Sequence, residues 1–115
     1  MDQHVDTDVL VVGAGIAGLQ TSLDLADRGY RVLLVEREAS TGGKMIALSK
    51  VFPTMDCASC ITTPRMSSVS HHDNVTTWTY TDVDSITPSE GAFTATLTRK
   101  ARYVDEDVCI GCRLC

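Results

Sequence analysis

The sequence lacks three features that would place it in common functional classes. It has no apolar run long enough to cross a membrane, and its first residues, MDQHVDTD, show neither the basic nor the apolar stretch of a signal peptide. It also has no excess of basic residues: the formal net charge is −5, which argues against nucleic acid as a partner. We therefore expect a cytoplasmic protein without a transmembrane segment.

The sequence has five cysteines, and an odd number of cysteines does not fit a set of disulfides in which every cysteine is paired. Cytoplasmic thiols are normally kept reduced, so we interpret these cysteines as redox groups or metal ligands. With 115 residues and 43% hydrophobic content, the chain has the size and composition of one small globular domain. A chain this short buries a low fraction of its surface, which makes it small for enclosing a large cofactor alone.

A dinucleotide-binding pattern occupies the first third of the chain. The apolar run 9–12 predicts a strand buried on both faces, and it leads into the motif Gly13-Ala14-Gly15-Ile16-Ala17-Gly18. Apolar residues then recur at helical spacing until Gly29, and a second apolar run, 32–35, ends on Glu36. Together these segments predict a βαβ unit and an α/β, Rossmann-like fold.

Each residue type in this pattern has a physical role. Gly13 permits a tight turn, Gly15 lets a pyrophosphate approach the backbone, and Gly18 lets the helix pack against the strand. The amides that open the helix carry a partial positive charge that attracts phosphates. Glu36 lies where a carboxylate can accept hydrogen bonds from ribose hydroxyls.

The residues after Glu36 favour FAD over NAD, although both fit a βαβ fingerprint. Arg37 follows the acid directly, and Gly42-Gly43-Lys44 come after a short loop. This arrangement resembles the two-dinucleotide-binding flavoproteins, in which a second glycine pair approaches the FAD. Lys44 is expected either to lie near the phosphates or the flavin, or to be a solvated surface lysine.

Cys57 and Cys60 form a C-x-x-C pair within a segment that has no sustained periodicity. Such a pair is a redox dithiol, half of a metal site, or two thiols without a chemical role, and the spacing alone leaves these interpretations open. Short helical turns are expected on either side of it, at 45–50 and 63–70.

Two strands are expected in the second half of the chain. The β-branched and aromatic run 75–83 predicts the first, and the alternation within 91–100 predicts the second, with a turn at 88–91. The adjacent His71 and His72 are interpreted as solvated loop residues.

The last residues, CIGCRLC, space Cys109, Cys112 and Cys115 evenly. They match the first three positions of the bacterial ferredoxin run and predict a [4Fe–4S] cluster. Zinc is the rival, but zinc sites more often use paired C-x-x-C units. Because a fourth ligand is missing, we expect a fragment: residues 1–100 as a partial FAD-binding domain, and 101–115 as the truncated start of a ferredoxin-like domain.

The order of these motifs resembles the A subunit of the heterodisulfide reductases, a family of FAD and iron–sulfur flavoproteins. The resemblance extends from Asp8 to Cys115 and rests on the FAD fingerprint, GGKM, FPTMDCASC, PRM and YVDEDVCIGCRLC. It implies an N-terminal fragment of an oxidoreductase subunit that passes electrons between FAD and [4Fe–4S] clusters in disulfide or sulfur metabolism. It also implies a redox or cluster-associated role near the flavin for Cys57 and Cys60.

The same resemblance implies partners: cysteine-rich and iron–sulfur subunits, with a hydrogenase, a dehydrogenase or ferredoxin as electron donor. Two other functions remain as alternatives. One is an NAD(P)H-dependent flavin disulfide reductase that uses Cys57 and Cys60, although Cys57 follows Gly43 by fourteen residues, further than in ordinary disulfide reductases. The other is a non-catalytic zinc-binding module.

Overall fold

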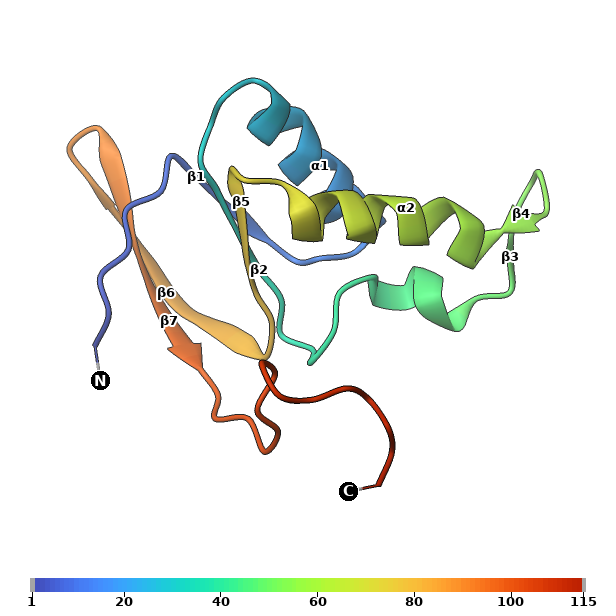
Figure 1. Ribbon diagram of the computed structural model, residues 1–115. Helices are drawn as coiled ribbons and strands as arrows, with labels where there is room; N and C mark the ends of the chain where they lie inside the picture. Colours follow the sequence, from blue (N-terminus) through green and yellow to red (C-terminus); the bar gives the residue numbers. More distant parts are fainter. Residues whose placement is uncertain (1, 115) are drawn as a thin grey trace.

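The computed structural model describes residues 2–114, which form a parallel sheet with helices on one face and a hairpin on the other (Figure 1). The three-stranded sheet has the order β1-β2-β5, and neighbouring strands pair in parallel. Its strands and the two helices that connect them are β1 (Val9–Val12), α1 (Ile16–Asp27), β2 (Val32–Val35), α2 (Ala58–His71) and β5 (Val75–Trp78). The predicted α/β Rossmann-like fold is confirmed.

Both helices cover the same face of the sheet because of the order in which the chain visits the strands. α1 connects β1 to β2, and α2 lies in the connection from β2 to β5, so the chain crosses the sheet in one direction. Connections between parallel strands are right-handed almost without exception. Two successive right-handed crossovers in one direction therefore place their helices side by side, as Figure 1 shows.

The hydrophobic core lies between these helices and the sheet. Leu19 from α1, Leu34 from β2 and Val69 from α2 are at most 2% exposed and form one cluster with Ala14. Partly buried apolar side chains pack around them: Val11, Leu23, Met66 and Val75. All four residues of β2 are buried, as the predicted two-sided burial requires.

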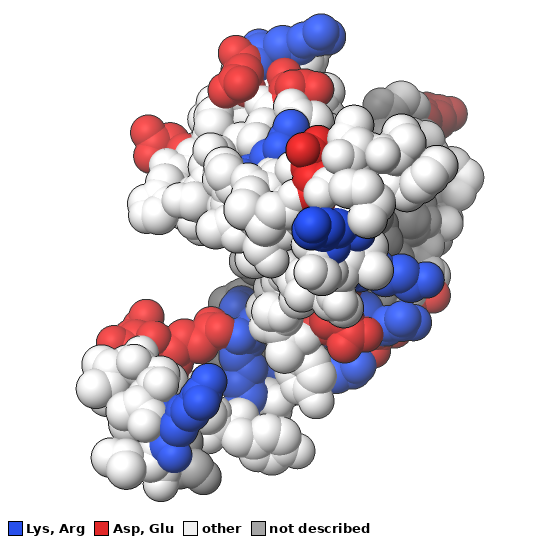
Figure 2. Space-filling model, turned by 90° about the vertical axis from the view of Figure 1, so that its right-hand side faces the viewer, with Lys and Arg blue, Asp and Glu red and all other residues white. Residues whose placement is uncertain are grey.

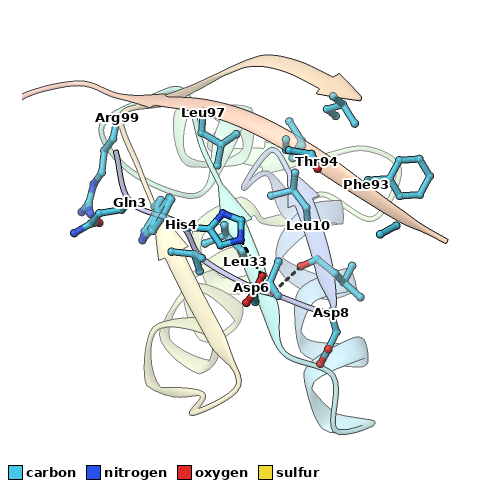
Figure 3. Close-up of a pocket in the computed structure, with 18 of the residues that line it drawn as sticks. Gln3, His4, Asp6, Asp8, Leu10, Leu33, Phe93, Thr94, Leu97 and Arg99 are labelled. Atoms are coloured by element: carbon cyan, nitrogen blue, oxygen red, sulfur yellow. Dashed lines mark hydrogen bonds and ion pairs between the residues drawn. The ribbon is translucent and has the colours of Figure 1, made fainter. Parts of the chain in front are cut away.

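A hairpin of β6 (Thr81–Ser89) and β7 (Ala92–Arg99) lies over the opposite face of the sheet. A cavity of about 890 Å³ separates the hairpin, the N-terminal segment and the sheet (Figure 3). Leu10 and Leu33 face it from the sheet, and Leu97 faces it from the hairpin. None of the residues that the sequence predicts to bind a cofactor lines this cavity.

An arm projects from the molecule between β2 and α2 (Figure 1). It begins with the 3-10 helix η1 (Gly43–Ala47) and continues as a short antiparallel pair, β3 (Lys50–Val51) and β4 (Asp56–Cys57). The sequence predicts a helical turn close to η1 but does not predict the strand pair. Strands of two residues carry no periodicity from which they could be recognised.

The expected strand 75–83 is wrong as a single element. The structure divides it into β5, which belongs to the parallel sheet, and β6, which belongs to the hairpin. Tyr80, between them, has a φ of +54°, and a strand cannot continue through that backbone conformation. The run of β-forming residues is continuous in sequence, so it does not indicate that the chain passes from the parallel sheet to the hairpin.

His72 is also not the solvated loop residue that the sequence suggests. It caps the C-terminus of α2, and its Nε2 lies 3.0 Å from Asp27 Oδ1 at the end of α1. The Asn74 amide donates to its Nδ1 over 3.1 Å, so a neutral ring carries its proton on Nε2 and donates it to Asp27. This contact joins the C-terminal ends of the two helices.

The surface carries charges of both signs, and on the face drawn in Figure 2 basic and acidic side chains are interspersed. Across residues 2–114, none of the helices combines the length and apolar character needed to cross a membrane.

Leu34 provides a test of the core. Leu34→Ala should lower the free energy of unfolding by about 2–5 kcal/mol, because it leaves a cavity among side chains from both helices. Leu114→Ala is the matched control: this leucine is 91% exposed, and its truncation should change stability by less than about 0.5 kcal/mol. Urea unfolding of both variants measures the difference, and equal effects would contradict the assignment of the core.

Candidate functional site

The glycine motif forms the turn between β1 and α1. Gly13 has a φ of +102°, which only glycine adopts easily, and its N–H donates to Val35 O over 2.8 Å. Gly15 is the N-cap of α1, and no side chain of the described residues caps the first amides of the helix. A Cβ added at Gly15 would meet no described atom within 4 Å, so the turn opens onto free space. Unpaired amides that face open space suit a phosphate.

Gly18 is required for a different reason. A Cβ at this position would lie 1.8 Å from Gly13 O, well inside any permitted contact. The first turn of α1 therefore packs directly on the backbone of the preceding turn. This is the helix-to-strand packing that the sequence predicts for the third glycine of the motif.

Glu36 connects the end of β2 to the glycine turn. Its Oε2 accepts a hydrogen bond from the Ala14 N–H over 2.7 Å, and its Oε1 accepts one from the Glu38 N–H over 2.9 Å. These bonds hold the carboxylate at the edge of the turn. Each carboxylate oxygen retains a second lone pair, so both can also accept from a hydroxyl.

The second glycine pair lies against the first motif. The Gly42 N–H donates to Ala14 O over 2.7 Å, and a Cβ on Gly43 would lie 2.9 Å from Gly15 Cα. Gly42 and Gly43 have φ values of +109° and +57°. The loop after β2 thus folds back over the glycine turn, and both glycines are needed for that approach.

Among the described residues, neither Arg37 nor Lys44 is held against the two glycine motifs or Glu36. Arg37 is exposed, and its Nε lies 3.8 Å from a carboxylate oxygen of Glu38. Lys44 is exposed in η1. The structure leaves the predicted cofactor contacts of both side chains as predictions.

Cys57 and Cys60 lie at the start of α2, at the base of the arm. Cys57 is the N-cap residue, and its Sγ accepts a hydrogen bond from the Cys60 N–H over 3.3 Å. The hydrogen bond from the Cys60 thiol, with that from the Cys60 amide, lowers the pKa of Cys57. The same thiol–thiol hydrogen bond raises the pKa of Cys60. Both residues are exposed.

The C-terminal segment 101–114 contains neither helix nor strand. The amides of Val108 and Cys109 both donate to Asp105 O, and the Gly111 amide donates to Cys109 Sγ over 3.4 Å. Cys109 and Cys112 are exposed free thiols, and the predicted third ligand, Cys115, lies outside the described residues. Within 2–114, no group of three or more His, Cys, Asp or Glu side chains is placed to hold a metal ion.

Arg102 anchors this segment to the sheet, and sequence reasoning missed it. Its Nη2 donates to Thr79 O over 3.1 Å and also bonds Thr79 Oγ1, while its Nη1 pairs with Glu106. Cys109, Tyr80 and Ala39 share a cavity of about 590 Å³ beside this contact. The cysteine segment therefore starts at the end of β5, next to the loop that follows Glu36. The sequence around Arg102 has no local pattern that would distinguish this arginine from its charged neighbours as the anchor.

Met66 is a second missed residue. A Cβ on Gly42 would lie 3.1 Å from its Sδ, so α2 supports the second glycine pair. The family resemblance points to Met66 through the PRM segment, but only the packing of α2 shows what its side chain contacts.

Comparison with known families identifies the same region. The family described as FAD dependent oxidoreductase matches residues 8–53, which contain both glycine motifs and Glu36. Among solved structures, the fold resembles L-proline dehydrogenase from P. horikoshii, with a TM-score of 0.74 and 21% identity over 83% of this chain and 19% of that one. At this identity, the similarity shows the fold alone.

Curated relatives match over nearly the whole chain. The iron–sulfur A subunit of CoB–CoM heterodisulfide reductase from Methanocaldococcus jannaschii is 50% identical over 97% of this chain and 17% of its own length. The A subunit of the H2/formate:CoB–CoM heterodisulfide,ferredoxin reductase from Methanococcus maripaludis is 48% identical over 96% and 17%. The chain thus spans about one sixth of the length of these relatives.

Gly15 and Gly18 form a matched pair for testing the dinucleotide site. Gly15→Ala should fold normally, because its φ of −74° suits alanine and the added methyl group enters open space. It should nevertheless weaken FAD binding at least about tenfold, since the methyl group occupies the approach to the backbone. Flavin titration followed by absorbance measures affinity, and circular dichroism measures folding.

Gly18→Ala should give the opposite result. Its methyl group meets Gly13 O, so we expect a loss of stability of about 3 kcal/mol or more, or no folded protein at all. A stable Gly18→Ala protein, or an unaltered flavin affinity in Gly15→Ala, would contradict the geometry of the turn.

Arg102→Ala should release the cysteine segment without unfolding the sheet. The amides of Val108 and Cys109 should then exchange with deuterium at least about tenfold faster, because their acceptor is no longer held in place. Arg28→Ala removes an equal charge at the far end of α1 and serves as the control. Hydrogen-exchange mass spectrometry measures the exchange rates in both variants. Unchanged protection in Arg102→Ala would show that the segment is anchored elsewhere.

Proposed function

This chain belongs by sequence to the A-subunit family of heterodisulfide reductases, and from that premise we propose that it forms the FAD site of an electron-transfer flavoprotein. The observation that carries the proposal is the meeting of two glycine motifs. Gly42 and Gly43 fold onto Ala14 and Gly15 at the edge where Glu36 is held. This edge lies at the carboxyl ends of the parallel strands, where open α/β sheets bind their ligands.

The residues at this edge fit FAD by their chemistry. The amides of Gly15 to Ala17 and the open space at Gly15 would receive the pyrophosphate, and Glu36 would accept from the ribose hydroxyls. Gly42 and Gly43 would let the second loop approach the cofactor without a side chain. Arg37 and Lys44 would complete the site as cations near its rim.

We further propose that Cys109, Cys112 and Cys115 ligate a [4Fe–4S] cluster. Their thiolates have the ferredoxin spacing, and the amide of Gly111 already donates to Cys109 Sγ. Residues 1–100 would then be the flavin part and residues 101–115 the start of the cluster part. When bound, FAD would supply two-electron transfer and the cluster one-electron transfer.

The role of this chain's residues would be to bind these groups at a fixed separation. Arg102 holds the cysteine segment to Thr79, at the end of the strand next to β2. Cys109 is thereby kept beside Ala39, in the loop between Glu36 and the second glycine pair. The distance between flavin and cluster would be set by the Arg102 side chain and by the short loop between Glu36 and the second glycine pair.

We propose that the protein acts in the cytoplasm within a heterodisulfide reductase-like complex. Its partners would be cysteine-rich and iron–sulfur subunits, and its electron donor a hydrogenase, a dehydrogenase or ferredoxin. One relative is named for H2 and formate as donors and another for ferredoxin, and these names support this class of donor. The disulfide or sulfur substrate would react on another protein of the complex.

A second candidate function is an NAD(P)H-dependent flavin disulfide reductase that uses Cys57 and Cys60. The observation that favours it is the hydrogen bond that Cys57 Sγ accepts from the Cys60 amide at the start of α2. Bleaching of the bound flavin by NAD(P)H, lost in Cys57→Ser, would favour this candidate over the first.

An anaerobic visible spectrum with flavin, iron and zinc analysis tests the main proposal. The purified chain, reconstituted with FAD, iron and sulfide, should show flavin bands together with broad iron–sulfur absorption. Cys112→Ser should lose the iron and keep the flavin, because the two sites use different residues. A colourless protein loaded with zinc would contradict the proposal and indicate a zinc-binding module.

A further inference from the structure

The β6–β7 hairpin, the sheet and the N-terminal segment surround a cavity that has no role in the proposed function. Its volume, about 890 Å³, lies in the range of small-molecule sites in proteins. The cavity is on the face of the sheet opposite the helices, and none of the residues proposed to bind FAD or a cluster lines it. A ligand held in this space, which we call the hairpin cavity, would therefore occupy a site separate from the flavin site.

The long walls of the hairpin cavity are apolar. Side chains alternate between the two faces of a strand, so Phe93 and Leu97 of β7 both point toward the sheet. Leu10 of β1 and Leu33 of β2 line the opposite wall (Figure 3). Phe93 is nevertheless 78% exposed, so part of this apolar wall is in contact with water. A hydrocarbon chain lying along the cavity would remove that surface from water.

One end of the hairpin cavity carries a positive charge. Arg99 follows Phe93 by six residues on the same face of β7, about 20 Å along the strand, and the two lie at opposite ends of the cavity (Figure 3). The guanidinium carbon of Arg99 lies over the Trp78 ring, 5.5 Å from its centre. Stacking on an aromatic face positions the guanidinium and leaves the N–H donors in its plane available to a carboxylate. Within residues 2–114, no carboxylate forms an ion pair with Arg99.

The acidic residues of the cavity favour a ligand with a single negative charge. Asp6 and Asp8 also line the space, and each has a partner: the ring of His4 lies 3.3 Å from Asp6, and the guanidinium of Arg31 lies 3.0 Å from Asp8. A second negative group on the ligand would be repelled by these carboxylates and would have no cation to compensate it. A single carboxylate placed at Arg99 avoids this repulsion.

We propose that the hairpin cavity binds an elongated amphipathic monocarboxylate, with its carboxylate on Arg99 and its hydrocarbon body between Leu10 and Leu97. The positive charge at one end and the apolar walls along the length match this class of ligand, and they disfavour cations and short polar acids. The inference goes beyond the proposed function and does not depend on bound FAD, because no residue of the flavin site lines the cavity.

Fluorescence titration of the purified chain tests the site directly, because Trp78 is the single tryptophan of the sequence and lines the cavity. Decanoate, kept below its micelle concentration, should change the Trp78 emission in a saturable way. Butyrate has the same carboxylate and a shorter chain, and it should bind at least about tenfold more weakly because it buries fewer methylene groups. Decyltrimethylammonium has the same chain and the opposite charge, and it should also bind at least about tenfold more weakly.

Arg99→Gln separates the role of the charge from a structural role. Glutamine keeps a long polar side chain and Arg99 is exposed, so the variant should fold normally. Decanoate should bind to it at least about tenfold more weakly, whereas decanol, which has no charge, should bind as it does to the unaltered chain. Arg28→Gln is the matched control: it removes an equal charge at the end of α1, outside the cavity, and should change neither affinity.

Ala95→Phe provides an independent test, because Ala95 faces the cavity between Phe93 and Leu97 and the added ring would fill part of the space. This variant should lose most of its affinity for decanoate and decanol alike, with an unaltered circular dichroism spectrum. Equal affinities of the unaltered chain for decanoate and decyltrimethylammonium, or an equal loss of decanoate and decanol binding in Arg99→Gln, would overturn the proposal. Undiminished decanoate binding in Ala95→Phe would overturn it as well.

Discussion

The contact between Gly18 and the carbonyl oxygen of Gly13 is the constraint on which the rest of this structure depends. With no Cβ at Gly18, the first turn of α1 lies directly on the turn that leaves β1. That closeness fixes where the helix amides point and where Ala14 sits. Ala14 in turn donates to Glu36 and accepts from Gly42, so two later segments of the chain are positioned by one missing side chain. The core beneath, around Leu19 and Leu34, then follows from the same placement of α1.

The first third of the fold could be predicted from sequence because its signals are local. The runs 9–12 and 32–35 are strands at those residues, and the helix between them begins inside the glycine motif. The middle could not be predicted in the same way. α2 begins at Ala58, five residues before the turn expected at 63–70, and it contains Pro64. Its burial against α1 and the cap at Cys57 outweigh a composition typical of a loop.

The candidate site shows the same division between local and spatial information. Motif chemistry predicted the glycines and Glu36 as site residues, because each would act through its own backbone or side chain. It did not predict that Glu36 binds the Ala14 amide, nor that the second glycine pair touches the first. It also missed Arg102, which acts on Thr79, a residue far from it in sequence. Contacts between distant segments leave no spacing in the sequence from which they could be recognised.

Parallel topology places all three predicted groups of site residues toward one edge of the sheet. The glycine turn and Glu36 follow β1 and β2, and the cysteine segment is tied to Thr79, directly after β5. α2 runs back toward the start of β5, so its own start lies at the opposite, carboxyl edge. A helix of 14 residues is about 21 Å long and a strand of 4 residues about 13 Å, so α2 extends beyond that edge and carries Cys57 with it.

The wide spacing between Gly43 and Cys57 therefore corresponds to an excursion of the chain beyond the edge of the sheet where the glycines lie. Those intervening residues form η1 and the arm, which leaves the sheet and returns to the start of the crossover helix. Met66, nine residues after Cys57, touches Gly42, which puts the thiols about 13 Å along the helix from the second glycine pair. In sequence, this spacing distinguishes the chain from ordinary disulfide reductases. In space, it is an insertion between β2 and its crossover helix, and the thiols lie beyond the edge where the glycines converge.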